Sequence, residues 1–254
     1  MDFWKAIAEV KKLNTATLLL YIFVPTLLLS GVYLLAGNLF QLPNLLLFCM
    51  IGTFTLVPIE LGIVCKASKE ETGKYSLRSA FVGQQRLKVW KIILIAAVFF
   101  GIAGLLSITV APLENHLFAG IRKAVLDRLP TSFDWTDHGY LRSFSKTTLR
   151  ITCLYYCIFN VLIAPITEEL FFRGYLTSHY ETQNPFTPIF LAILFSLYHF
   201  WLPFNNIFRI LAFAPVAYVA YKKRNIYISI VFHCLCNLFS SIGFCFTVLQ
   251  YIQL

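Results

Sequence analysis

An uncharged run from Ile151 to Ile166 leads directly into two adjacent glutamates, Glu168 and Glu169. A run of this kind approaches the ~20 apolar residues that a helix needs to cross the hydrocarbon core of a bilayer. An ionised side chain at that depth costs about 3 kcal/mol, so it persists where it is paired, hydrated or used. We therefore expect a membrane helix with a functional site at its carboxylate pair.

The composition supports a membrane location for the whole chain. Of its 254 residues, 58% are hydrophobic and only 13% are charged, against about 25% charged residues in soluble domains. The formal net charge is +9, but the basic residues gather in short clusters between apolar runs, as in cytoplasmic loops of membrane proteins. The sequence thus predicts an all-α polytopic membrane protein whose partner is the lipid bilayer, and it argues against nucleic acid.

The apolar runs predict about seven transmembrane helices. Their approximate ranges are 15–36, 45–65, 92–111, 149–179, 187–202, 204–221 and 226–250. Apolar residues at helical spacing between 113 and 129 predict an amphipathic helix on the membrane surface. The basic segments 66–91 and 222–224 place those loops, and the N-terminus, in the cytoplasm. We divide the chain into N-terminal helices with a polar loop, 1–147, and a catalytic helical core, 148–254.

Two smaller expectations concern single residues. Glu60 lies near the end of the second apolar run, and we expect it to pair with Lys66 at the membrane boundary. The seven cysteines all fall in or beside apolar segments, without a Cys-x-x-Cys pair. An odd number also argues against a complete disulfide framework, so we expect free, small apolar side chains.

Polar residues on three separate apolar helices form the candidate site. Glu169 and Arg173 are four residues apart and share a helix face, which leaves Glu168 to face something else. His199 is expected near the middle of the fifth span, and His233 and Asn237 lie four apart in the seventh. Each of these groups is costly alone in a membrane. We therefore expect four of them to meet in one wet cavity: Glu168, His199, His233 and Asn237.

These residue types suit peptide hydrolysis. A carboxylate and an imidazole can share a water molecule and remove its proton as it attacks a carbonyl. A second imidazole and an amide can donate hydrogen bonds to the oxyanion that develops.

The same residues carry a family resemblance over about 150–240. Glu168-Glu169-x-x-x-Arg173, Phe195-x-x-x-His199 and His233-x-x-x-Asn237 resemble the three motifs of the CPBP family. That family comprises the type II CAAX prenyl endopeptidases and the bacterial Abi-type proteins associated with bacteriocin processing and self-immunity. Each motif alone is weak evidence for the family. The three motifs together, in order on three apolar helices, are specific evidence for it.

The resemblance implies a role for each residue. Glu168 and His199 would activate water, His233 and Asn237 would stabilise the oxyanion, and Glu169 and Arg173 would support them. It implies a metal-free site, with zinc on Glu168, His199 and His233 as the alternative, although no His-Glu-x-x-His spacing is present.

The expected function is therefore that of an intramembrane endopeptidase in a multi-pass protein of the bacterial plasma membrane. Its partner would be a membrane-associated peptide or protein precursor, such as a leader peptide or a bacteriocin. The main alternative is a non-proteolytic self-immunity or scaffold protein of the same fold. A proton-coupled transporter is disfavoured because the two halves share no polar pattern.

Overall fold

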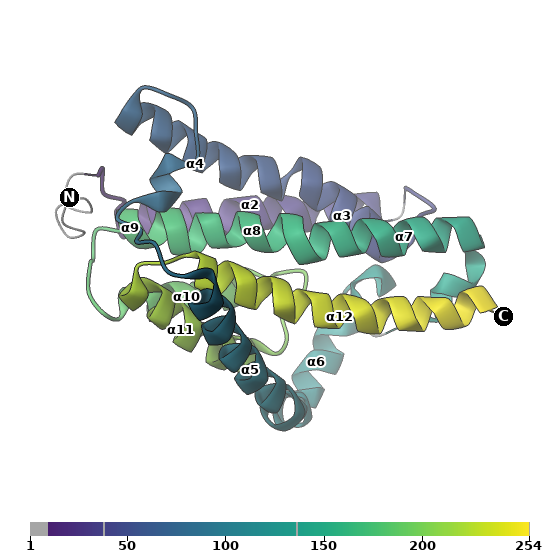
Figure 1. Cartoon of the computed structure of the whole chain (residues 1–254). Helices are drawn as coiled ribbons and strands as arrows, with labels where there is room; N and C mark the ends of the chain where they lie inside the picture. Colours follow the sequence, from purple (N-terminus) through teal and green to yellow (C-terminus); the bar gives the residue numbers. More distant parts are fainter. Residues whose placement is uncertain (1–9, 38, 136, 254) are drawn as a thin grey trace.

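The computed structural model describes residues 10–37, 39–135 and 137–253, and this part of the chain consists of helices joined by turns and loops, without a strand (Figure 1). Five segments are long and apolar enough to cross a membrane. They are α2 (Thr15–Ala36), α3 with α4 (Asn44–Phe54 and Leu56–Thr72), α5 (Val89–Leu117), the continuous helix Lys146–His179, and α12 (Tyr227–Gln253). The predicted all-α membrane architecture is confirmed.

The two remaining predicted spans are less regular. The helix α10 (Thr187–Leu197) has 11 residues, which rise about 16 Å, roughly half of a ~30 Å hydrocarbon core. Its neighbour α11 (Asn206–Lys223) has 18 residues but carries Arg209 and two terminal lysines. The count of seven spans therefore stays a prediction.

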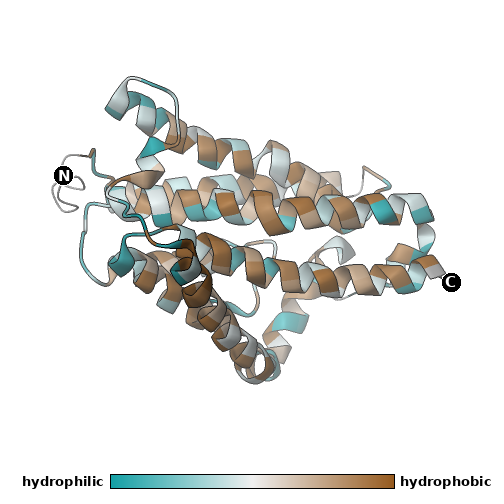
Figure 2. Cartoon of the chain, in the orientation of Figure 1, coloured by the Kyte–Doolittle hydropathy of each residue, from teal (hydrophilic) through white to brown (hydrophobic). Residues whose placement is uncertain are grey.

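Apolar side chains cover the outside of the long helices. Leu35 is 72% exposed, Phe54 75% and Ile108 72%, a surface that water-soluble monomers rarely present. Figure 2 shows the same pattern, with hydrophobic residues along the helices and hydrophilic residues mainly near the helix ends and turns. This surface fits a lipid environment.

The predicted end of the third span, 92–111, is wrong. The helix α5 continues through Pro112 to Leu117, and only the short α6 (Ala119–Leu126) occupies the segment where we expected a surface helix over 113–129. Proline is tolerated inside membrane helices because neighbouring groups satisfy the freed backbone. The extension places the carboxylate of Glu114 against α11, where it accepts hydrogen bonds from Ile207 N at 3.0 Å and Phe208 N at 2.8 Å.

Arg209 holds the turn between α10 and α11. Its guanidinium donates to three backbone carbonyls, at 2.9 Å to Ser196, 3.3 Å to Leu202 and 3.2 Å to Phe204. Non-helical backbone at membrane depth needs such partners, because lipid supplies none. Arg209 thereby fixes the turn that carries His199.

The helix Lys146–His179 widens twice around the glutamate pair. It consists of α7 (Lys146–Ile158), a π-helical turn η4 (Phe159–Ile163), α8 (Ala164–Glu169), a second π-helical stretch η5 (Leu170–Leu176) and α9 (Thr177–His179). Pro165 is the second residue of α8, directly after the first π turn, so a widened turn accommodates this proline and the helix does not end there. Short π segments of this kind often accompany functional sites.

A glycine sets the distance between η5 and the segment η1 (Arg78–Phe81). A Cβ atom on Gly174 would lie 2.6 Å from the carbonyl oxygen of Ala80. The close approach of these two backbones therefore requires glycine at this position.

Candidate active site

Glu168 and Glu169 occupy the end of α8, between the two π-helical stretches. Both are buried: Glu168 is 5% exposed and Glu169 is 0% exposed. Consecutive residues on a helix point about 100° apart, so the two carboxylates reach different neighbours.

Glu169 bridges Arg173 and His233. Its Oε1 lies 3.2 Å from the Arg173 guanidinium and 3.0 Å from Nδ1 of His233. Arg173 is itself buried and lies over the ring of Phe195, 4.2 Å from the ring centroid. The structure thus brings together the predicted i, i+4 pair and adds a contact with His233 that the sequence analysis did not foresee.

His233 lies between the two glutamates. While Nδ1 faces Glu169, Nε2 lies 3.7 Å from Oε2 of Glu168. That second distance is too long for a direct hydrogen bond. Nε2 is therefore left to a water molecule or a substrate atom.

We expected His199 to lie inside a helix. It lies instead in the turn just after α10 ends at Leu197. The predicted span 187–202 is thus too long at this end. Nδ1 of His199 lies 2.7 Å from the carbonyl oxygen of Phe195. A carbonyl only accepts hydrogen bonds, so Nδ1 carries the proton and Nε2 presents a lone pair.

Asn237 follows His233 by one helical turn, and its amide meets the widened turn η4. Nδ2 of Asn237 donates to the carbonyl oxygen of Asn160 at 2.8 Å. Asn160 in turn donates from Nδ2 to the hydroxyl of Ser241 at 3.0 Å. The same Nδ2 lies 3.5 Å from Oδ1 of Asn160, a contact at the outer limit for a hydrogen bond. Because an amide has two N–H donors, the second N–H can turn to another partner.

One cavity joins the four predicted catalytic side chains. Its volume is about 310 Å³, and Glu168, His199, His233 and Asn237 all line it. Glu169 and Arg173 do not border the cavity and lie behind His233 and Glu168. The structure therefore separates four predicted site residues that border the cavity from two that do not.

Tyr198 is a site residue that the sequence analysis missed. Its fully buried hydroxyl donates to Oε1 of Glu168 at 3.1 Å. One indication of its importance was visible in the sequence, because Tyr198 directly precedes His199 in an otherwise apolar segment.

Glu60 also belongs to this region, which corrects the predicted pair with Lys66. The Glu60 side chain is 0% exposed, whereas Lys66 is exposed. Glu60 lies close to both Tyr198 and Glu168, so it faces the interior of the bundle and not the membrane boundary.

Arg209 is the third missed residue, and it lines the same cavity. An arginine within an apolar run was visible in the sequence, but three of its partners are backbone carbonyls, which no sequence motif indicates.

Glu168, His199 and His233 are the side chains that the zinc alternative would use. Within the described residues, no three His, Cys, Asp or Glu side chains are placed to share one metal ion. The seven cysteines are free, as expected, and Cys49 alone is fully buried.

The helices and the buried site together define a class of protein: a polytopic membrane protein with a glutamate–histidine cavity inside its helical bundle. Residues 150–239 match the family model described as Type II CAAX prenyl endopeptidase Rce1-like. This region of the chain is therefore similar to the CAAX proteases of the membrane. No curated protein and no solved structure matches the chain.

The matched region contains all six predicted site residues, from Glu168 to Asn237. The match gives no support to the bacteriocin-immunity or Abi-type branch that the resemblance also included. The family model does not cover the residues before 150.

Proposed function

We propose that this protein is an intramembrane endopeptidase that hydrolyses a peptide bond in a membrane-associated peptide or protein precursor. The observation that carries the proposal is the cavity lined jointly by Glu168, His199, His233 and Asn237. It collects a carboxylate, two imidazoles and an amide, which are the groups that peptide hydrolysis by an activated water requires.

Glu168 acts as the general base. The hydrogen bond from Tyr198 fixes its Oε1, so Oε2 is directed to the water molecule that it deprotonates. The lone pair on Nε2 of His199 accepts the second hydrogen of that water and orients it. The resulting hydroxide attacks the substrate carbonyl carbon and forms a tetrahedral intermediate.

His233 and Asn237 stabilise the oxyanion of that intermediate. Asn237 donates through its remaining amide N–H, and His233 donates through Nε2. Donation from both nitrogens of His233 requires the imidazolium form. In that form the charges of Glu168, Glu169, Arg173 and His233 sum to zero, which limits the cost of the buried cluster.

The reaction is completed when the C–N bond breaks. The proton that Glu168 took from water passes to the leaving nitrogen, which departs as an amine, while the other product is a carboxylic acid. Glu168 then returns to its carboxylate form. This sequence needs no metal ion, and zinc remains the alternative to be tested.

The decisive experiment combines one substitution with one chelator titration on the purified protein. Glu168→Gln keeps size and polarity but removes the base, so cleavage of a precursor peptide should fall by about 10²–10⁴-fold. A zinc chelator should leave the parent rate unchanged. Loss of cleavage on chelation, restored by added zinc, would support the zinc alternative.

A Glu168→Gln variant that cleaves at the parent rate would rule out the proposed mechanism. If the same variant kept a biological phenotype while no peptide was ever cleaved, the protein would be a scaffold of the same fold.

A further inference from the structure

Glu60 is a buried carboxyl group that the proposed mechanism does not use. It belongs to α4, whose buried residues recur at four-residue spacing along one face: Leu56, Glu60, Val64 and Ser68. Leu56, one helical turn before Glu60, lines the cavity of the candidate active site. The buried face of α4 therefore belongs to the surroundings of the site, although the family model covers only residues 150–239.

The surroundings of Glu60 provide no counter-charge for its carboxyl group. The side chain is 0% exposed, and within the described residues neither of its oxygens has a hydrogen-bond partner. Its charged neighbour is Glu168, which has the same sign. An ionised carboxylate in an apolar interior is costly without a partner, and such a group takes up a proton instead. Glu60 should therefore be a neutral carboxylic acid, which can donate a hydrogen bond.

The hydroxyl of Tyr198 lies close to both Glu60 and Glu168. It donates its single proton to Oε1 of Glu168 at 3.1 Å. If Glu60 were ionised, the two carboxylates would compete for that one proton. A neutral Glu60 removes the competition, because it can donate to a lone pair of the Tyr198 oxygen.

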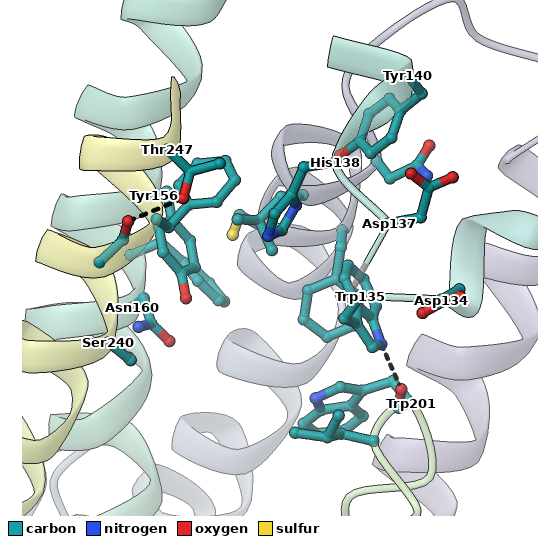
Figure 3. Close-up of a pocket in the computed structure, with 18 residues that line it drawn as sticks. Asp134, Trp135, Asp137, His138, Tyr140, Tyr156, Asn160, Trp201, Ser240 and Thr247 are labelled. Carbon is teal, nitrogen blue, oxygen red and sulfur yellow. Dashed lines mark hydrogen bonds between the residues drawn. The ribbon is translucent and has the colours of Figure 1, made fainter. Parts of the chain in front are cut away.

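The backbone and the ring of Tyr198 are fixed by other contacts. Its carbonyl oxygen accepts a hydrogen bond from the hydroxyl of Thr26. In the wall of a neighbouring cavity of about 390 Å³, Trp135 donates from Nε1 to the carbonyl oxygen of Trp201 at 2.7 Å, which braces the same turn (Figure 3). The ring of Tyr198 packs edge-on against Phe172, with ring centroids 5.2 Å apart. What remains to be set is the direction of the hydroxyl group.

We infer that Glu60 is a positioning residue for the proposed reaction, a neutral acid that donates to the Tyr198 oxygen and so directs the Tyr198 hydroxyl to Glu168. Linked hydrogen bonds polarise one another, so this bond also strengthens the one that Tyr198 donates. A carboxylic acid kept neutral by an apolar site can serve catalysis as a donor. The inference rests on the proposed function, and it adds a residue from the N-terminal helices to that same site.

The kinetic experiment compares two substitutions of Glu60 in the purified protein. Glu60→Met keeps the length of the side chain and removes the donor, so kcat for a cleaved peptide should fall about 2- to 10-fold while KM stays unchanged. Glu60→Gln keeps a neutral donor and should recover most of that loss. Leu61→Met is the matched control, because Leu61 is the next residue of α4 and does not border the catalytic cavity. A kcat for Glu60→Gln as low as that for Glu60→Met would overturn the inference.

The same substitution in the Tyr198→Phe protein tests whether Glu60 acts through Tyr198. Without the hydroxyl there is nothing left to direct, so Glu60→Met should lower kcat no further in that background. A purely structural role would lower kcat by the same factor in both backgrounds, and that result would also overturn the inference.

Infrared spectroscopy tests the protonation of Glu60 without any substrate. At neutral pH, the parent spectrum minus the Glu60→Gln spectrum should contain the carbonyl band of a neutral carboxylic acid. In the Tyr198→Phe background, this band should shift to higher frequency, because the acid loses its hydrogen-bond acceptor. A difference spectrum without the band would show that Glu60 is ionised and would overturn the inference.

The two kinds of measurement allow the inference and the proposed function to fail separately. Cleavage by the parent protein without the infrared band would contradict the role of Glu60 and leave the proposed function intact. The band without cleavage of any peptide would contradict the proposed function, while the neutral acid beside Tyr198 would stand.

Discussion

Glu169 Oε1 lies 3.0 Å from Nδ1 of His233, and this contact joins the helix Lys146–His179 to α12 at the candidate active site. The same carboxylate also meets Arg173 at 3.2 Å. Glu169 therefore both neutralises a buried guanidinium and orients an imidazole that borders the cavity. We therefore expect Glu169 to act on the site through His233 rather than on a substrate.

Glu169→Gln should mainly destabilise the fold. The change leaves Arg173 buried without its counter-charge, which typically costs about 3–5 kcal/mol. We expect a lower yield of folded protein and a lower midpoint of thermal unfolding, with partial activity in the protein recovered. Glu70→Gln is the control, because Glu70 forms an exposed ion pair with Lys11 and such pairs add little. A stable but inactive Glu169→Gln protein would show that the two glutamates have the opposite roles.

Tyr198→Phe should slow catalysis while leaving the fold intact. It removes only the hydroxyl that holds Glu168, and a hydrogen bond to a charged group is worth about 1.5–3 kcal/mol, or about 10- to 100-fold in rate. Steady-state kinetics on a cleaved peptide should place the loss in kcat. Tyr155→Phe is the control, since its hydroxyl bonds Thr53 and Tyr155 borders neither cavity. A parent-like kcat for Tyr198→Phe would contradict the role of this bond.

Arg209→Lys should loosen the turn that carries His199. Lysine keeps the charge but lacks the planar fork that reaches three carbonyls, so we expect a loss of about 3 kcal/mol. The midpoint of thermal unfolding should fall, and peptide cleavage should fall with it. Arg150→Lys on the exposed side of α7 should change neither quantity. Equal stability of the two variants would mean that the turn is held by other contacts.

Gly174→Ala should destabilise the protein by about 1–3 kcal/mol, because its methyl group overlaps the Ala80 backbone. The matched change Gly62→Ala, on α4, introduces a Cβ with nothing within 4 Å. Chemical unfolding of the two variants compares them directly. If Gly174→Ala were as stable as Gly62→Ala, the contact between η1 and η5 would be adjustable.

The long helices could be predicted from the sequence because a long apolar run identifies a membrane helix. The ranges 15–36 and 149–179 agree closely with Thr15–Ala36 and Lys146–His179. The ends at Pro112 and after Leu197 were misjudged for a common reason: tertiary partners decide them. Glu114 can reach α11 only when α5 extends past Pro112, and no local pattern encodes that contact.

The candidate site was predictable where its residues are polar exceptions on apolar helices. Glu168, His199, His233 and Asn237 stand out in that way, and all four line one cavity. Tyr198 and Asn160 do not stand out, since tyrosine and asparagine are common near membrane helices. Glu60 was noticed and given the wrong partner, because the helical phase that turns it inward depends on the packing of α4.

The contact of Glu114 with the start of α11 also constrains the order in which the chain can be assembled during synthesis. The hairpin of α10 and α11 leaves the ribosome after α5. Its arginine bonds carbonyls within the hairpin, but the first backbone N–H groups of α11 find the Glu114 carboxylate only on α5. Inserted alone, α10 is too short and α11 too polar to settle in the bilayer. We therefore expect α5 to act as an intramolecular template, with the hairpin entering the membrane only after α5 is in place.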